Sequence, residues 1–512
     1  MKSKGTFYLV GAGPGDAGLL TLRGAELLRR ADVVIYDMLV NPDLLRLAPT
    51  GAELISRGSR GTVEALSQEQ ITALMIAKSR EGKCVVRLKG GDPYVFGRGG
   101  EEAEELAAAK IPFEVVPGVS SIVAAPNYAG IPLTHRDYCS TFTVLTGHDN
   151  PGNEDSGLDF AEIARIPGTK LILMGLKHLR ELAETFIARG LPPDTPVAIV
   201  RWGTTGRQRS VEGTLATIAD IAARAEISAP AITIIGDVVK LRPKLNWFEH
   251  QPLFGQRVVV TRTRAQASQL AARLIDLGAD VLEIPTIRIV EPSAGRRQEI
   301  VDALLELNSY DWLVFTSPNG VTAFFDLFFR RFQDLRDIGG ARIAAIGPAT
   351  AAKLQELHLQ VDLMPDEAVS SRIAAAFQKY ESIENLKICL LRAEVASADL
   401  VRDLEALGGI VDDIAVYRTV IQTEDPGGVA ARLVESGADW ITFMSASSVE
   451  HFHARFNLPE HLKKFPNTRL ASIGPQTSKA IRALGLEPAV EPRDHSLDGL
   501  VKAIVSAAGK AA

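Results

Sequence analysis

The 512-residue sequence predicts an α/β protein of roughly two to four domains, and two observations carry this prediction. In the first half, short apolar segments end in glycine-rich turns that lead into helical patterns. Open sheets that bind ligands at the ends of their strands show this arrangement. In the second half, a pattern of alternating strands and helices occurs twice, which predicts a duplicated, flavodoxin-like pair of lobes.

The composition is that of an ordinary globular protein and excludes several classes of function. Hydrophobic residues make up 46% of the chain, charged residues 23%, and the formal net charge is −6. General nucleic-acid binding is therefore not expected, and an anionic substrate must be met by local arginines. Cys84, Cys139 and Cys389 are scattered, so neither a disulfide framework nor a metal site is predicted. No apolar run reaches the roughly 18 residues that span a bilayer, and we expect a cytoplasmic protein without a membrane partner.

The stretch Arg87–Glu102 carries the strongest signal for a binding site in the first half. Gly90 and Gly91 come shortly after the apolar strand predicted for Cys84–Val86, and without a Cβ they let the backbone approach a ligand closely. Asp92 offers a carboxylate for ribose-type hydroxyls. Arg98 stands among three further glycines, and its planar fork of donors suits a substrate carboxylate.

A second glycine-rich turn, Gly11–Asp16, follows the strand predicted for Thr6–Val10. A helical pattern and the strand Val33–Tyr36 come next, and this strand ends on Asp37. Turn, helix, strand and acidic residue together are the pattern of a dinucleotide site. The spacing disfavours a nicotinamide or flavin cofactor, because an aspartate replaces the third glycine of G-x-G-x-x-G and a proline lies in the turn.

The motifs of the first half resemble those of the uroporphyrinogen-III C-methyltransferase family, in the family's order, over about residues 5–247. The segments that carry the resemblance are Tyr8–Asp16, Val34–Asp37, Lys89–Glu102, Val116–Ser121, Tyr128–Arg136, Trp202–Thr205, Arg207–Arg209 and Pro230–Val239. The resemblance implies two α/β lobes, with S-adenosyl-L-methionine folded into the cleft between them. This fold is not that of a Rossmann methyltransferase.

The resemblance also implies which residues form the site. Asp37 is the best candidate for a general base, because methylation of a pyrrole carbon leaves a proton to be lost. Its alternative role is that of a loop-capping carboxylate. Arg98 and Arg136, ahead of His135, are implied to bind the carboxylates of the substrate. The positions implied to contact the cofactor are Pro14, Gly90, Gly91, Asp92, Val95, Ser120, Ser121, Met174 and Gly203. Without the resemblance, the methionine of this set would be expected in the core.

The first half departs from its family at one position. Relatives usually carry a Gly-Lys-Arg run after the third strand, and here Ser59 stands at the lysine and Arg60 at the arginine. A serine cannot hold a positive charge, so it can neither pair with a substrate carboxylate nor act on Asp37. Two explanations remain open: Arg57 or Arg60 supplies the cation, or the first half is slow or takes another acceptor. The first is favoured because the other motifs are intact.

A domain boundary is predicted between the halves. Residues 248–254 form a short segment that contains Pro252 and has poor periodicity. This fits a linker between a first domain of residues 1–247 and a second of residues 255–512, and not a long flexible tether.

Beyond the linker, four segments occur twice. The pairs are Arg257–Arg262 with Lys387–Arg392, Leu277–Val281 with Leu407–Val411, Asp311–Ser317 with Asp439–Ser445, and Ala345–Thr350 with Ser472–Thr477, at an offset between 127 and 130 residues. Each copy is predicted to form one parallel lobe. A duplication without a metal or nucleotide motif suggests a ligand held between two lobes. In both copies an Ile-Gly-Pro-x-Thr turn is expected to present a hydroxyl and free N–H groups to a carboxylate.

This half resembles uroporphyrinogen-III synthase over about residues 255–508. The resemblance implies two α/β lobes joined by a pair of crossover segments around an open cleft. Tyr417 matches the family's tyrosine near the hinge, and Thr350 and Thr477 match its lobe threonines. A phenol at this place can assist the departure of a hydroxyl by hydrogen bonding. The alternative for Tyr417 is a plain half-buried aromatic residue.

Together the two resemblances imply a bifunctional enzyme that cyclises hydroxymethylbilane to uroporphyrinogen III and methylates this product twice to precorrin-2, for siroheme or cobalamin. The alternatives are a methyltransferase for a later precorrin and a second half that binds tetrapyrroles without catalysis. The expected partners are small-molecule tetrapyrroles and a second copy of the chain, through a homodimer of the methyltransferase half.

Overall fold

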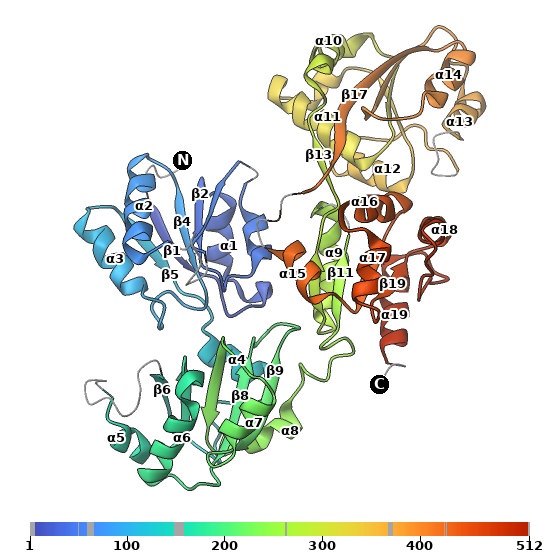
Figure 1. The fold of residues 1–512 in the computed structure, drawn as a ribbon. Coiled ribbons are helices and arrows are strands. Elements are labelled where there is room, and N and C mark those ends of the chain that lie inside the picture. The colour runs from blue at the N-terminus through green and yellow to red at the C-terminus, as the bar shows by residue number, and fades with distance from the viewer. Residues whose placement is uncertain are drawn as a thin grey trace.

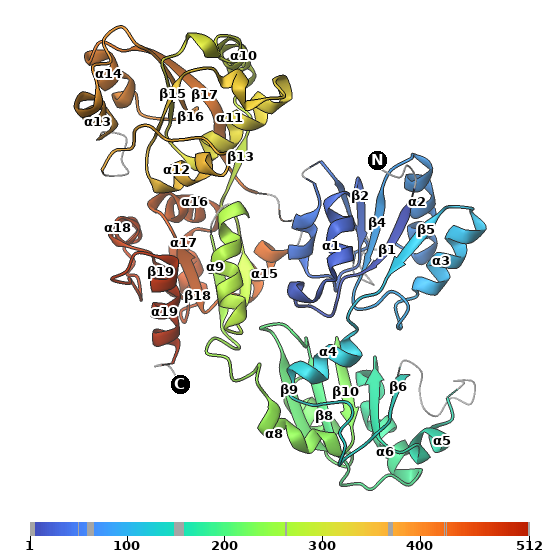
Figure 2. The ribbon, with the colours of Figure 1, turned by 180° about the vertical axis from the view of Figure 1, so that it is seen from behind.

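The computed structural model describes residues 6–49, 51–58, 66–147, 158–261, 264–366, 372–423, 425 and 428–509. Within these ranges the strands form four sheets, two in each half of the chain (Figure 1, Figure 2). Helices accompany each sheet, which confirms the predicted α/β fold. No helix in this described part of the chain has the length and apolarity that a membrane crossing requires.

The first sheet is parallel and has the strand order β3-β2-β4-β1-β5. Its elements are β1 (Phe7–Gly11), α1 (Leu22–Arg29), β2 (Val33–Tyr36), β3 (Glu53–Ser56), α2 (Gln68–Arg80), β4 (Val85–Lys89), α3 (Gly99–Ala108) and β5 (Phe113–Val116). Apolar runs explain β1 and β2, which are buried except for Tyr36. Because parallel strands end at one edge of a sheet, the loops after β1, β2, β4 and β5 gather there.

The second sheet is mixed and has the order β6-β7-β10-β8-β9. Strands β6 and β7 pair in parallel, and the other neighbours pair antiparallel. The elements are α4 (Ser121–Tyr128), β6 (Phe142–Thr146), α5 (Phe160–Arg165), β7 (Thr169–Leu173), α6 (Leu179–Ala188), β8 (Pro196–Arg201), β9 (Arg209–Thr214), α7 (Ile218–Arg224), β10 (Ala231–Ile235) and α8 (Arg242–Leu245). Helix α4 leads from the first lobe into the second (Figure 1).

The second half also contains two sheets. One is parallel, with the order β12-β11-β18-β19, and the other has the order β13-β17-β16-β14-β15, in which β13 pairs antiparallel. The elements of the first are β11 (Arg257–Val260), α9 (Arg264–Asp276), β12 (Asp280–Glu283), α15 (Val429–Ser436), β18 (Trp440–Phe443), α16 (Ala446–Phe456), α17 (Leu458–Lys464), β19 (Arg469–Ser472), α18 (Pro475–Ala483) and α19 (Leu497–Ala508). The elements of the other are β13 (Ile287–Val290), α10 (Arg297–Leu305), β14 (Trp312–Phe315), α11 (Pro318–Arg331), β15 (Arg342–Ala345), α12 (Pro348–Gln355), α13 (Ile373–Tyr380), β16 (Lys387–Ala393), α14 (Asp399–Ala406) and β17 (Ile410–Ile421).

Each lobe of the second half is assembled from both copies of the repeat, so the prediction of one lobe per copy is wrong. Strands β11 and β12 of the first copy share a sheet with β18 and β19 of the second. In the other lobe, β14 and β15 of the first copy share a sheet with β16 and β17 of the second. The chain therefore crosses between the lobes twice, after β12 and after β17.

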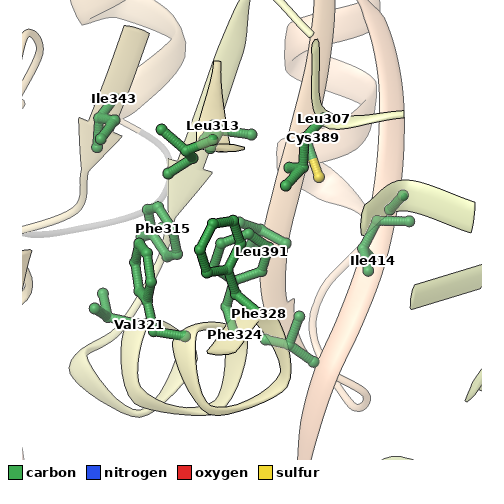
Figure 3. Close-up of a cluster of buried hydrophobic side chains, with 14 of the residues drawn as sticks. Leu307, Leu313, Phe315, Val321, Phe324, Phe328, Ile343, Cys389, Leu391 and Ile414 are labelled. Atoms are coloured by element: carbon green, nitrogen blue, oxygen red, sulfur yellow. The ribbon is translucent and has the colours of Figure 1, made fainter. Parts of the chain in front are cut away.

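The core of the lobe that contains β14 shows why α11 has its run of aromatic residues (Figure 3). Phe324 and Phe328 lie one helical turn apart, are buried, and face the sheet. The ring of Phe324 packs at 5.6 Å from that of Phe315 on β14. Phe329, on the next position of the helix, is 46% exposed. One stripe of α11 thus holds the sheet that carries Tyr417.

The predicted linker packs tightly against the first half. Glu249 accepts hydrogen bonds from Gln208 (2.8 Å), Ser210 (2.6 Å) and Arg242 (2.6 Å). Burial alone would raise the pKa of the Glu249 carboxyl, but the hydrogen bonds from Ser210 and Gln208 and the charge of Arg242 hold it below its usual value. Phe248 is also buried. The connection between the halves is therefore anchored at its start.

The two halves also touch directly. Arg46 forms an ion pair with Glu283 at the end of β12. Burial raises the pKa of the Glu283 carboxyl, and Arg46 opposes this rise only in part. In a second contact the backbone of Gly206 lies against Asp280, so close that a Cβ on residue 206 would lie 2.2 Å from the Asp280 nitrogen. This approach requires a glycine.

Candidate active sites

Three loops meet at the carboxyl edge of the first sheet, and glycines let them touch. Gly13 after β1 and Gly91 after β4 exchange two backbone hydrogen bonds, of 3.2 and 2.7 Å. Gly118 after β5 lies so close that a Cβ there would be 2.2 Å from the Gly91 carbonyl oxygen. The φ of Gly91 is 67°, which also favours glycine. We refer to these three residues as the glycine junction.

The Asp92 carboxylate holds two of these loops together by hydrogen bonds. One of its carboxylate oxygens accepts a hydrogen bond from the Tyr94 N–H (2.8 Å), and the other accepts one from the Gly118 N–H (3.0 Å). Each carboxylate oxygen has a further lone pair, so the predicted bond to a ribose hydroxyl remains compatible with these contacts. That role stays a prediction.

Helix α4 brings two of the predicted serines to the glycine junction. Ser120 is the N-cap of α4 and accepts a hydrogen bond from an N–H of the first turn, and Ser121 begins the helix. A Cβ built on Gly91 would lie 3.8 Å from the Ser120 Cα, so the serines stand next to the junction. The first-lobe loops also carry Pro14, Gly90 and Val95.

The second lobe contributes Met174 and Gly203. Met174 directly follows β7, has a φ of 58° and exposes half of its side chain, so it is not a core residue. Gly203 follows β8, and a Cβ there would lie 2.5 Å from the Ala125 Cβ. The neighbouring Thr204 hydroxyl accepts a hydrogen bond from the Asp16 N–H (3.1 Å), which ties the second lobe to the loop after β1.

The chemistry of these nine positions fits S-adenosyl-L-methionine. The serine hydroxyls and the backbone groups of the glycines can hydrogen-bond to an adenosine and an amino acid, and Met174 offers an apolar contact. Asp92 is the one charged residue among the nine. Its negative charge suits a cofactor with a positive sulfonium.

A buried cluster of charges surrounds Asp37 at the end of β2. Arg87 donates a hydrogen bond of 2.5 Å to one oxygen of Asp37, and the Lys89 Nζ lies 3.8 Å from the other. Lys89 also donates to Glu102 at 3.0 Å. Burial, followed by the charge of Arg87, lowers the pKa of Lys89. Arg87, Lys89 and Glu102 are almost fully buried, whereas the Asp37 side chain is 21% exposed. Asp37 is thus the member of the cluster that a substrate can reach.

Arg57 adds another cation beside Asp37. Its Nη1 lies 3.7 Å from the Asp37 Oδ1. This is the place that the compensation hypothesis predicts for a substitute of the missing lysine. Ser59 and Arg60 themselves lie outside the described residues.

Arg87, Lys89 and Glu102 were not predicted as site residues. The strand before the glycine-rich stretch was expected at Cys84–Val86, whereas β4 extends to Lys89. Charged residues at alternate positions of an apolar strand point to one face of the sheet, and burial of charge there needs partners. Arg87 and Lys89 follow that pattern, so a signal was present.

The two arginines predicted to bind substrate carboxylates are both exposed. Arg98 lies directly before α3 and pairs with Glu101 at 2.5 Å. Arg136 forms no ion pair within the described ranges, and the neighbouring His135 lies 3.9 Å from Asp137. Both arginines can therefore meet a ligand from solvent, and their role stays a prediction.

In the second half, Tyr417 lies on β17, close to the crossover between the lobes. The residue is 7% exposed, and its hydroxyl oxygen lies 3.0 Å from that of Ser317. Ser317 is the N-cap of α11 and accepts a hydrogen bond from the Gly320 N–H at 3.0 Å. Ser317 was not predicted as a site residue. The repeat contained a signal, because the equivalent Ser445 caps α16 in the same way.

Thr350 and Thr477 lie in the predicted strand-to-helix turns, at the starts of α12 and α18. Both are buried, at 1% and 3% exposure. The Thr350 hydroxyl donates to the Ile346 carbonyl at 3.1 Å, so, contrary to the prediction, this hydroxyl is turned inward. These turns can still bind an anion through the first N–H groups of each helix. A role of the two threonines in substrate binding stays a prediction.

Comparison with known proteins assigns each half. A family model of tetrapyrrole (corrin/porphyrin) methylases matches residues 6–219, and one of uroporphyrinogen-III synthase HemD matches residues 268–502. A porphyrin biosynthesis protein HemD from Ruminiclostridium josui is 38% identical over 507 residues, which are 99% of this chain and 98% of that protein.

Two further relatives cover less of the chain. A uroporphyrinogen-III C-methyltransferase from Bacillus subtilis is 39% identical over 74% of this chain and 78% of its own. An S-adenosyl-L-methionine-dependent uroporphyrinogen III methyltransferase from Methanosarcina barkeri is 51% identical over 46% of this chain and 93% of its own.

The two family models therefore define a tetrapyrrole methylase joined to a uroporphyrinogen-III synthase. The prediction of a bifunctional enzyme of tetrapyrrole biosynthesis is confirmed. The chain belongs to the family of the Ruminiclostridium josui porphyrin biosynthesis protein HemD.

Proposed function

We propose that residues 255–512 cyclise hydroxymethylbilane to uroporphyrinogen III, and that residues 1–247 methylate this product twice to precorrin-2, for siroheme or cobalamin. The observation that carries the proposal is that one chain holds both arrangements: Asp37 among its cations, and the hydroxyl pair of Tyr417 and Ser317. The methyltransferase half uses S-adenosyl-L-methionine.

In the first half, the cofactor supplies an electrophilic methyl group, and the protein positions the acceptor and takes up a proton. The glycine junction and α4 fix the loops that would hold the cofactor, which limits the motion of donor and acceptor. Arg87 occupies one oxygen of Asp37 at 2.5 Å, so the other oxygen is the one that accepts the proton released by the methylated ring. Arg98 and Arg136 bind carboxylates of the tetrapyrrole.

In the second half, the bond between the hydroxymethyl carbon and its oxygen breaks while the pyrrole supplies the electron pair. Tyr417 donates a hydrogen bond to the departing hydroxyl. Ser317, 3.0 Å away, orients the phenol and is itself held at the start of α11. The helix-starting turns with Thr350 and Thr477 bind substrate carboxylates through their N–H groups. A carbon–carbon bond then closes the ring with inversion of the last pyrrole, and the proton lost from the pyrrole carbon combines with the departed hydroxide to give water.

We further propose that the enzyme is a homodimer through its methyltransferase half. Large apolar side chains exposed on this half support an interface, among them Leu22 at 92% and Val123 at 50% exposure. Light scattering on the purified full chain should give twice the mass of one chain, and a monomeric mass would contradict the proposal.

Supplying each half with its own substrate tests the proposed function. With hydroxymethylbilane alone, the oxidised product should be the isomer with the inverted pyrrole. With uroporphyrinogen III and S-adenosyl-L-methionine, mass spectrometry should show two added methyl groups. Ring closure without inversion would disprove the synthase assignment, and absence of methylation would disprove the methyltransferase assignment.

A further inference from the structure

A cavity of about 790 Å³ lies between the two halves of the chain. One wall is the turn between β8 and β9 in the methyltransferase half. The other is formed by residues at the amino-terminal ends of β11, β12 and β18, by α15, and by the segment after α17. Both views place the β8–β9 hairpin beside the lobe that contains β11 (Figure 1, Figure 2).

The cavity carries an excess of positive charge. Its basic residues are Arg201, Arg207, Arg209, Arg257, Arg432 and Lys464, against the three acidic residues Asp280, Glu435 and Asp439. Asp280 is shared between Arg257 and Arg432. Asp439 accepts a hydrogen bond from the Arg257 backbone N–H at 2.7 Å. Most of the negative charge on the synthase wall is therefore already engaged.

None of the three arginines on the methyltransferase wall has a carboxylate partner among the described residues, and Arg209 donates to the Ala225 carbonyl at 2.9 Å. Arg207 lies over the Trp202 ring, with its guanidinium carbon 3.7 Å from the ring centroid. Burial, followed by the charge of Arg432, lowers the pKa of Arg207 to about 10. The Nε of Arg201 is buried and has no hydrogen-bond acceptor within the described ranges. Both side chains thus lie in a partly dehydrated place that favours an anion.

We propose that this cavity binds a tetrapyrrole polycarboxylate through its carboxylates, at a site separate from both active sites. The proposal rests on the proposed function, because the substrates and products of that function are tetrapyrroles with several carboxylates. The cavity has a volume of about 790 Å³ and receives cations from both walls, so a ligand with several carboxylates can contact more than one of them. Trp202, Phe465 and Pro466 add apolar surface for a ring system.

The position of the cavity separates it from the synthase cleft. It lies at the amino-terminal ends of β11 and β18, whereas the Ile-Gly-Pro turns follow the carboxyl ends of β15 and β19. On its other side, the arginine-bearing turn also contains Gly203 and Thr204, and Thr204 is bonded to Asp16 near the cofactor loops. A ligand in the cavity would therefore contact both halves and the turn that leads to the methyltransferase site.

Calorimetric titration of the full chain with uroporphyrin III, the stable oxidised octacarboxylate, tests the proposal. The variant Arg201→Gln with Arg207→Gln should lose one binding site or weaken it by about tenfold or more, as expected for lost charge-assisted hydrogen bonds. Lys464→Gln, on the opposite wall, should weaken the same site. Arg224→Gln removes one positive charge from an exposed position on α7, outside the cavity, and this variant should bind as the unmodified chain does.

Unchanged uroporphyrin binding in either cavity variant would overturn the proposal. If the double variant does not fold, Lys464→Gln alone decides. Displacement of the porphyrin by an equal concentration of inorganic phosphate would show a small-anion site and would also overturn it. Methyl transfer and ring closure are measured on the same preparations. If the unmodified chain fails in these assays, the proposed function is wrong, whereas the binding result still decides whether the cavity takes a polycarboxylate.

Discussion

The hydroxyl oxygens of Tyr417 and Ser317 lie 3.0 Å apart, although the two residues are 100 positions apart in the sequence. Tyr417 comes from the strand that continues to the interlobe crossover, and Ser317 caps the helix that packs on the same sheet. The phenol is therefore held in one orientation by a residue that is itself fixed by a helix cap. Every buried tyrosine needs a partner for its hydroxyl, as Tyr310 shows with Asp412, so the rate of ring closure is what separates a catalytic Tyr417 from a structural one.

Tyr417→Phe should slow ring closure by a factor of about 10²–10⁴, because the departing hydroxyl loses its hydrogen-bond donor. The free energy of unfolding should change by only about 1 kcal/mol, since the ring stays in the core. Synthase activity and thermal unfolding are measured on the same preparation.

Tyr310→Phe is the matched control for this change. Tyr310 belongs to the same core, and its hydroxyl donates to Asp412 at 2.7 Å, away from the proposed site. Both variants lose one phenolic hydrogen bond. An equal rate of ring closure in Tyr417→Phe and Tyr310→Phe would return Tyr417 to a purely structural role.

Arg57→Ala should lower methyl transfer to uroporphyrinogen III roughly threefold to tenfold, because Asp37 loses a cation at 3.7 Å that is itself 20% exposed. Adding Ser59→Lys to this variant should restore part of the loss. Arg80→Ala removes the same charge from an exposed place at the end of α2 and serves as the control. The compensation idea fails if Arg57→Ala and Arg60→Ala both methylate as well as the unmodified chain.

Glu249→Gln should destabilise the methyltransferase half by about 2–3 kcal/mol, because the charge that accepts from Arg242, Ser210 and Gln208 is removed. Glu212→Gln is the control, since Glu212 also pairs with Arg242 but is 40% exposed and should cost less than about 1 kcal/mol. Denaturant unfolding measures both. Equal stability of the two variants would contradict an anchored linker.

The contribution of Glu249 should depend on pH. The pKa of this carboxyl is lower in the folded protein than its ordinary value of 4.5. The stabilisation is therefore fully present above pH 4.5 and is lost as the pH falls through the folded-state pKa. The difference in unfolding free energy between the unmodified chain and Glu249→Gln should shrink below pH 4.5, and a constant difference down to pH 3 would contradict this assignment.

The anchored linker also decides where the halves can be separated. A fragment of residues 1–250 keeps Glu249 and should fold and methylate uroporphyrinogen III. A fragment of residues 1–248 should methylate too, but with a lower unfolding temperature, because Arg242 loses its buried partner. Loss of methyl transfer in a soluble, folded 1–250 fragment would show that the halves are not independent.

Local pattern predicted strands and turns well and predicted their pairing poorly. The strand Val33–Tyr36 was predicted with its observed bounds, because a buried apolar run between turn residues has few alternatives. The repeat revealed the strands of the second half but not their exchange between lobes. Which strands share a sheet is decided by packing over more than 100 residues of sequence, and both copies carry the same local signals.

The candidate sites show the same division. Loops whose backbones lie in contact need glycines such as Gly91. A glycine-rich turn stands out in a sequence because few turns contain several glycines. Lys89 and Ser317 were missed although the alternating charges of β4 and the repeated serine before α11 and α16 were signals, because the sequence does not show which partners these side chains meet in space. Thr350 was expected to face a ligand, yet its hydroxyl bonds to the preceding turn, a choice that serine and threonine often make in helices.

We expect one chain to carry out both reactions in succession. The most direct measurement supplies the purified full chain with hydroxymethylbilane and S-adenosyl-L-methionine labelled in its methyl group, and analyses the tetrapyrrole by mass spectrometry. The product should be cyclic and carry two labelled methyl groups. An unmethylated macrocycle, or a methylated one only after uroporphyrinogen III is added, would contradict this expectation.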